Sequence, residues 1–304
     1  MLASNKTDLS TIKTYPFTSG ETVPIPQFLD NAGTINFKGR FNGFYKDFVT
    51  FGTFTSKNGK VSTDLKLVQK NNGTIHYDGK IKTVDFDLGE LTNNHKTFNK
   101  TSFDIDVMGE NMDFESMSLQ VKGAASRFDL FGYSYKSITF DGAIAKKEIT
   151  GLLAIADTNV NLNFDGKIDL SGSKPKYAFV SQIDHLRPKQ LHLLERDTSA
   201  SLSTKVLFNF EGDNLDNVLG RAALEDFNFV ENNNPVHLEK VDFTAFTSGE
   251  DKSLALKSDN IDLQITGQFK FNKYCNPSIT LFRNGFLPHS HPLPKNQMIF
   301  KIFT

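Results

Sequence analysis

Apolar and polar residues alternate along most of the chain, from about residue 33 to residue 273. Five heptamers repeat one version of this alternation, and they begin at residues 35, 75, 138, 162 and 263. In each heptamer, as in INFKGRF, positions 1, 3 and 7 are apolar, position 5 is glycine, and the residues between are mostly polar. Successive side chains of a β-strand point to opposite faces. The pattern therefore predicts many strands that are apolar on one face and polar on the other.

Turn residues separate these runs and predict hairpins. Asn58–Gly59 lies between two alternating runs and is a dipeptide typical of a type I′ hairpin turn. Asn72–Gly73 repeats the dipeptide shortly before the second heptamer. The unequal spacing of the heptamers argues against a solenoid, whose repeats keep a constant length. We therefore predict an all-β fold, a long antiparallel meander of hairpins.

Helical patterns are short and few. Residues 214–226 carry apolar residues at the spacing of one helix face, with Asn214 as N-cap. Residues 187–195 predict one or two helical turns, and residues 85–91 predict a single turn between strands. We expect these segments to be a few short helices within the β-architecture.

The predicted apolar face needs a covering, and the pattern leaves two alternatives open. A second sheet or several helices would make a β-sandwich or barrel with an ordinary closed core. Alternatively, a curved sheet would keep the apolar face as an open groove, filled by lipid chains or by a partner. The heptamer glycines would supply curvature or clearance for a neighbouring backbone, or else mark simple bulges: Gly39, Gly79, Gly142, Gly166 and Gly267.

The two ends of the chain differ from the middle. Residues 1–32 contain three prolines and little periodicity, and are predicted to be an irregular lead-in. Residues 33–273 are predicted to form the β-domain. Residues 274–304 lose the alternation and gain prolines, so we interpret them as an atypical tail, truncated or aberrant.

Composition and charge narrow the function classes. The 34 basic and 35 acidic residues nearly balance and form no basic patch, so nucleic acid is not an expected partner. The 29 Phe and 7 Tyr residues favour strands. No apolar run reaches the ~18 residues of a membrane-spanning helix. The first residues also lack the pattern of a signal peptide.

Residues that could carry chemistry do not form a convincing site. Asp157, Asp165 and Asp169 lie close in sequence, but Asp165 and Asp169 are predicted in turn and outward strand positions. The pair at residues 289 and 291, both His, has no acidic or Cys companion at metal-ligand spacing. Cys275 has no base nearby. We therefore predict no enzyme, no metal site and no cofactor.

Several sequence segments are more specific than the alternation of apolar and polar residues alone. They are GRFNGFYKDFVTFGTF, the F-D-G-x-I turns, D-x-N-x-x-L-x-F-D-G and H-L-x-x-x-x-L-x-L, in this order along the chain. With their flanking strands, they resemble the TamB-type translocation and assembly module proteins of Bacteroidetes, within the wider AsmA-like group of envelope proteins. The resemblance runs from about residue 30 to residue 273, and it depends on the order of the phrases more than on any one of them.

Proteins of this family have an inner-membrane anchor helix and a periplasmic body, whose long taco-like β-sheet encloses an apolar groove. That body is thought to help phospholipid transport between the membranes or the assembly of outer-membrane proteins. The resemblance implies a curved sheet with an apolar interior, in the periplasm and cell envelope. It also implies an internal or C-terminal fragment, because the anchor helix is absent from this chain and the tail differs from the family's C-terminal module.

Under this resemblance, apolar residues of the heptamers would line the groove and no residue would need to do chemistry. The ligand would be a phospholipid or another acyl-chain lipid, because each buried CH₂ contributes ~0.8 kcal/mol. An outer-membrane β-barrel assembly protein would be a further partner. The expected lining residues are Ile35, Phe37, Phe41, Ile75, Tyr77, Ile81, Ile138, Phe140, Leu162, Phe164, Ile168, Leu263, Ile265 and Phe269.

Two other functions remain open from the sequence. A structural or adhesive β-sandwich would close the apolar face with its own second sheet. A β-helical carbohydrate-active enzyme would need clustered acids and a constant rung length, and the sequence offers neither.

Overall fold

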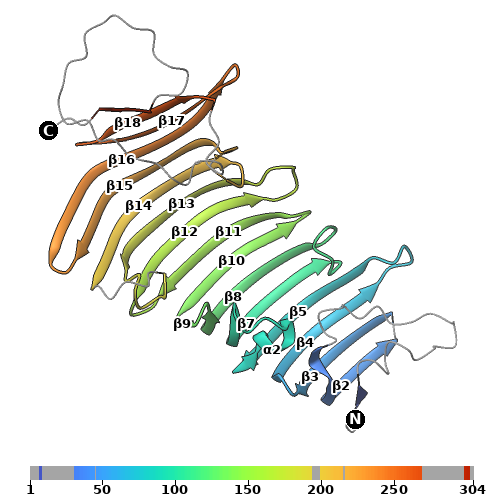
Figure 1. Ribbon diagram of the computed structural model, residues 1–304. Helices are drawn as coiled ribbons and strands as arrows, with labels where there is room; N and C mark the ends of the chain where they lie inside the picture. The colour runs from blue at the N-terminus through green and yellow to red at the C-terminus, as the bar shows by residue number, and fades with distance from the viewer. Residues whose placement is uncertain are drawn as a thin grey trace, which may run out of the picture. The chain divides into compact units, whose positions relative to one another are not determined.

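The computed structural model describes residues 7–8, 31–44, 46–193, 199–214, 216–268 and 298–301. The chain is all-β, as predicted, and neighbouring strands pair in antiparallel orientation (Figure 1). It divides into two compact units. Unit 1 comprises Met1–Asn163 and Pro188–Arg196, and unit 2 comprises Phe164–Arg187 and Asp197–Thr304.

Unit 1 is a meander in which most strands pair with the next along the chain. The short β1 (Thr7–Asp8) pairs with the start of β2. The other strands are β2 (Thr34–Phe44), β3 (Asp47–Ser56), β4 (Gly59–Gln69), β5 (Ile75–Val84), β6 (Phe86–Asp87), β7 (Phe98–Glu110), β8 (Ser118–Leu130), β9 (Tyr133–Tyr135), β10 (Ile138–Ala145) and β11 (Glu148–Ala156). The next strand, β12 (Val160–Asp169), begins in unit 1 and ends in unit 2.

Unit 2 repeats the same antiparallel arrangement. They are β13 (Lys176–Leu186), β14 (Ala200–Glu211), β15 (Leu219–Glu231), β16 (Asn234–Ser248), β17 (Asp251–Ser258), β18 (Asp262–Gly267) and β19 (Met298–Lys301). Each pairs with the next, from β13 to β19. The meander predicted from hairpin signals is therefore confirmed.

One hairpin turn lies one residue earlier than predicted. The pair Ser56 and Gly59 closes the hairpin between β3 and β4, so Lys57 and Asn58 are its turn residues. Gly59 begins β4 with φ +128°, and a Cβ there would lie 3.2 Å from the Cα of Phe86. The glycine is therefore needed for a close approach inside unit 1 and not for the turn itself.

Of the three predicted helical segments, one is a helix. Helix α2 (Leu88–Thr92) overlaps the predicted turn at 85–91 and ends one residue after it. The Asp87 carboxylate accepts a hydrogen bond from the Glu90 N–H at 2.8 Å. In the predicted segment 187–195, residues 188–192 form turns, and residues 194–195 lie outside the described part. The helix predicted at 214–226 is wrong, because most of that segment belongs to β15.

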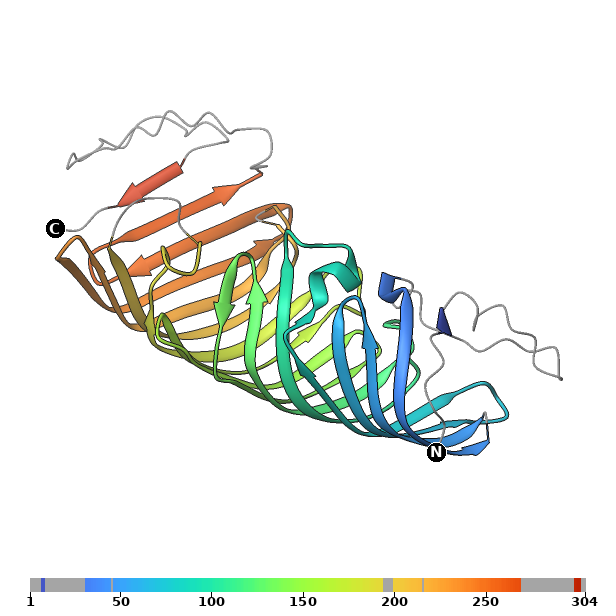
Figure 2. The ribbon, with the colours of Figure 1, turned by 90° about the horizontal axis from the view of Figure 1, so that it is seen from below.

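The registers place apolar side chains of neighbouring strands on one face in unit 1. Ile81 of β5 pairs with Ile105 of β7, which pairs with Gly123 of β8 and through it with Phe140 of β10. Figure 2 shows these strands bowed, with α2 on the inside of the bend. Because α2 packs beside apolar-face residues, the apolar face is the inner face of the bend.

The heptamer glycines in unit 1 allow close approach within regular ladders. The registers run without a shift through Gly39, Gly79 and Gly142, so the bulge alternative does not apply to these three. A Cβ on Gly39 would lie 2.2 Å from the Phe51 carbonyl oxygen, and one on Gly79 would lie 2.0 Å from that of Asp64. These glycines therefore give clearance to the neighbouring strand on the apolar face.

Candidate functional site

The apolar face of unit 1 contains eight of the predicted lining residues on three strands. Ladder partners connect them: Tyr77 pairs with Leu67 of β4, and Ile138 pairs with Ala125 of β8. The eight residues are Ile35, Phe37, Phe41, Ile75, Tyr77, Ile81, Ile138 and Phe140. The structure therefore brings together, on one face of unit 1, residues that are up to about a hundred positions apart in sequence.

The predicted lining residues of β12 and β18 follow the same alternation. Leu162, Phe164 and Ile168 share one face of β12. In unit 2, the ring of Phe164 lies 5.1 Å from that of Phe179, on β13. Leu263 and Ile265 of β18 pair with Leu256 and Leu254 of β17. Phe269 lies outside the described residues.

Most side chains of the apolar face are half-buried. Of the predicted lining residues, Tyr77 and Ile138 are buried, Phe41 is 40% exposed, and the other described ones are intermediate. A closed sandwich core would bury such residues almost completely. Within the described part of each unit, no second sheet covers this face, so the closed core of the sandwich alternative is not formed by these residues.

Helix α2 covers one margin of the apolar face in unit 1. Leu91 packs with Phe86 and Ala32 in a small buried cluster, and Ile35 and Val61 of the sheet pack against it. On the exposed side of the helix, Glu90 forms an ion pair with Lys57, and its Oε2 lies 3.3 Å from His95 Nε2. The helix thus closes the ends of β2 and β4 and leaves the middle of the face open.

In unit 2, the apolar face is dominated by stacked phenylalanines that the sequence pattern did not single out. The Phe179 and Phe208 rings are 4.9 Å apart at an interplanar angle of 17°, and Phe210 lies 4.8 Å from Phe208. Phe243 extends the series, 5.7 Å from Phe210. The alternating runs YAFVSQI and TKVLFNFEG contain three of these rings, so alternation without the heptamer glycine could have identified them.

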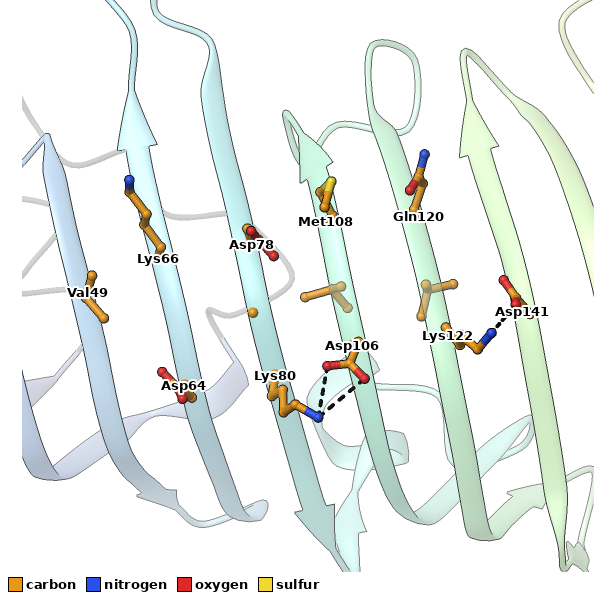
Figure 3. A pocket seen from close by; sticks show the side chains of 13 residues that line it. Val49, Asp64, Lys66, Asp78, Lys80, Asp106, Met108, Gln120, Lys122 and Asp141 are labelled. Atoms are coloured by element: carbon orange, nitrogen blue, oxygen red, sulfur yellow. Dashed lines mark hydrogen bonds and ion pairs between the residues drawn. The ribbon is translucent and has the colours of Figure 1, made fainter.

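The opposite face of unit 1 carries charges of alternating sign across the strands (Figure 3). Lys80 of β5 pairs with Asp106 of β7 at 3.1 Å, and Lys122 of β8 pairs with Asp141 of β10 at 2.8 Å. These charges line a shallow depression of the polar face. Each side chain is more than half exposed, so the individual ion pairs contribute little stability. They instead favour one register and oppose sheet-to-sheet association.

Asp129, at the end of β8, is a buried carboxylate with several donors. It accepts hydrogen bonds from Arg127 (2.8 and 2.9 Å), from the Ser134 hydroxyl (2.5 Å) and from the Lys100 N–H (3.2 Å). Burial raises the pKa of Asp129, but these donors and the charge of Arg127 outweigh it and hold the pKa below its usual value. Through these bonds Asp129 links β8 to Ser134 of β9 and to Lys100 of β7.

We expect Asp129→Asn to lower the free energy of unfolding by about 1–3 kcal/mol at pH 7, because it weakens charge-assisted hydrogen bonds. A lowered folded-state pKa stabilises the fold above the unfolded-state pKa, near ~3.9, and this contribution is lost as pH falls through the folded-state pKa. The difference between parent and variant should therefore shrink below about pH 4. Urea unfolding at several pH values measures it, with the exposed Asp64→Asn as control. A difference that is equal at pH 7 and pH 3 would contradict this role.

The other candidate groups do not converge. Asp165 is exposed and Asp169 binds the Ser171 hydroxyl, as expected for solvated positions, whereas Asp157 is buried and accepts hydrogen bonds from the Lys136 and Asn159 N–H groups. Among the described residues, no three potential metal ligands lie together. Residues 275, 289 and 291 lie outside the described part.

Comparisons with known proteins give no relative for this chain. No protein-family model, curated protein or solved structure matches it. In the described part of the chain, no helix is long and apolar enough to span a membrane.

Proposed function

We propose that the chain is a non-enzymatic protein of the periplasm and cell envelope, whose apolar face holds the acyl chains of phospholipids. In this function it would serve lipid transport between membranes or the assembly of outer-membrane proteins. One observation carries the proposal: each unit presents a face of mostly half-buried aliphatic and aromatic side chains, and among the described residues no second sheet covers it. In the described part of the chain, α2 and Ala32 in unit 1 and Val218, in the loop before β15, in unit 2 pack on it from outside the main strands. A large uncovered apolar surface on a protein is typical of a binding site for a partner or lipid.

The dimensions of unit 1 are compatible with this ligand. Eight strands, from β2 to β11 without the short β6 and β9, contribute to its apolar face. At ~4.8 Å between neighbouring strands, they span roughly 34 Å. One lipid leaflet contributes about half of the ~30 Å hydrocarbon thickness of a bilayer. An extended acyl chain lying across the strands would therefore find apolar contacts along its whole length.

The two faces of β2 and β3 provide a matched test of acyl-chain binding. Phe41 lies on the apolar face and is 40% exposed, whereas Phe51, on the next strand, lies on the polar face and is 61% exposed. Because both rings are exposed, an aspartate at either position should leave the sheet folded. We expect phospholipid to co-purify with the full chain from a bacterial host, to fall at least threefold in Phe41→Asp, and to persist in Phe51→Asp.

Native mass spectrometry with lipid extraction measures the bound lipid, and circular dichroism verifies that both variants keep their strands. Equal lipid in the two variants would show that the lipid sits elsewhere or is carried non-specifically. A parent chain that is free of lipid, and that takes up none from phosphatidylethanolamine vesicles, would refute the proposed function.

A further inference from the structure

In the described part of the chain, the outer edge of β2 has ladder partners at only two positions. β2 pairs with β3 from Asn36 to Phe44. On its other side, in the described part of the chain, β1 reaches only Thr34 and Ile35. An edge strand of this length presents a row of N–H and C=O groups on which a further strand can form a ladder.

Two basic side chains and one large, strongly exposed apolar side chain lie along this edge. Lys38 and Arg40 are exposed on the polar face, and neither has an acidic partner among the described residues. Phe44, at the end of β2, is 84% exposed. Acidic side chains on a neighbouring strand would complete the alternation of charge that the interior strands of unit 1 already show.

An internal strand pair of the same unit shows what kind of strand fits. The heptamer of β5 has Gly79 and Lys80 where that of β2 has Gly39 and Arg40. Beside β5, β7 places Asp106 opposite Lys80, and Asp104 forms a 2.8 Å ion pair with Lys82. The other face of β7 is apolar, with Ile105 opposite Ile81 of β5. A strand of this type would continue both faces of the sheet past β2.

We propose that the edge of β2 binds an extended segment of a partner protein as an added antiparallel strand, apolar on one face and acidic on the face that meets Arg40. The added strand is expected to be antiparallel because the described ladders of unit 1 are antiparallel. A second copy of the chain fits poorly, because β2 paired with itself near its centre would place Lys38 and Arg40 opposite basic residues of its copy. This inference is independent of lipid binding.

The test uses the full chain and a fluorescent peptide with the sequence of residues 103–110, FDIDVMGE, read by fluorescence anisotropy. We expect saturable binding that weakens about three- to fivefold in Arg40→Asp, since opposed like charges are unfavourable. A peptide carrying Asp106→Lys should bind the Arg40→Asp chain better than it binds the parent. Lys66→Asp, on an interior strand of the same face, is the matched control and should leave binding unchanged.

Two peptides, N-methylated at the odd-numbered or at the even-numbered residues, keep the charges, and one of them loses the row of N–H donors that faces β2. Loss of binding by one of the two supports strand addition. Binding of both that equals binding of the parent peptide would reduce the contact to charge attraction and overturn the proposal, as would the absence of any binding by the parent peptide. Concentration-dependent dimerisation of the chain that Arg40→Pro abolishes would assign the edge to a second copy instead.

Discussion

Replacing Phe210 by alanine is expected to lower the free energy of unfolding by about 3–5 kcal/mol, the range for truncating a buried phenylalanine. Phe210 is 4% exposed and forms the centre of the buried cluster of unit 2, with Ala245 and Leu254. Its ring also joins two further phenylalanines of the apolar face. Removal would leave a cavity among these side chains and beneath Val218, which packs against them from the loop before β15.

The matched control is Phe246→Ala, on β16 of the same unit. Phe246 lies on the polar face and is 50% exposed, so its truncation should change the unfolding free energy by less than about 0.5 kcal/mol. Urea unfolding followed by circular dichroism compares the two variants with the parent. Similar losses for both, or a loss below about 1 kcal/mol for Phe210→Ala, would mean that the stacked rings do not form the core of unit 2.

The alternation of apolar and polar residues was sufficient to predict the class of fold and the faces of the strands. It succeeded because side chains change face at every residue, whatever the neighbouring strand is. Tyr77 and Phe140 could therefore be assigned to one face without knowledge of the register. The registers, the division into two units and the position of α2 depend on contacts between distant residues, and no local pattern contains them.

The failed helix at 214–226 shows how two periodicities can overlap. Leu219 and Ala222 have helical spacing, yet Gly220, Ala222 and Leu224 also alternate with polar or small residues. Alanine can be accommodated in a helix or in a strand, so the contacts with neighbouring elements determine which of the two forms. β15 pairs with β14 on one side and β16 on the other, and these two ladders outweigh a weak helical preference. The Asn214 carbonyl instead closes a turn, by accepting from the Val218 N–H at 3.0 Å.

The candidate site was predicted in part for a related reason. The heptamer was recognisable because its glycine gave it a signature, and the described residues of all five copies follow the alternation. Phe179 and Phe208 belong to runs without that glycine, although their rings are the best-stacked pair of unit 2. The glycine therefore marks where strands must approach closely, whereas the stacked rings show where large side chains of neighbouring strands pack together on the apolar face.

Gly79 links the heptamer signature to the close approach of strands in unit 1, and its replacement should have a large effect. Its φ of +147° is unfavourable for other residues, and a Cβ there would lie 2.0 Å from the Asp64 carbonyl oxygen and 2.9 Å from the Leu65 Cα. Both contacts are with backbone, which cannot move aside without disturbing the ladder between β4 and β5. We expect Gly79→Ala to lower the free energy of unfolding by at least about 3 kcal/mol.

Gly73→Ala separates the two causes of this loss. Gly73 also has a positive φ, +85°, but a Cβ there would meet nothing within 4 Å, so only the backbone strain of about 1–2 kcal/mol applies. Urea unfolding of both variants should show Gly79→Ala at least about 2 kcal/mol less stable than Gly73→Ala. Equal losses of unfolding free energy in the two variants would mean that β4 and β5 can move apart to accommodate the Cβ without loss of stability. In that case the heptamer glycine would reflect backbone conformation alone, and the close approach of strands on the apolar face would not explain why the chain repeats it.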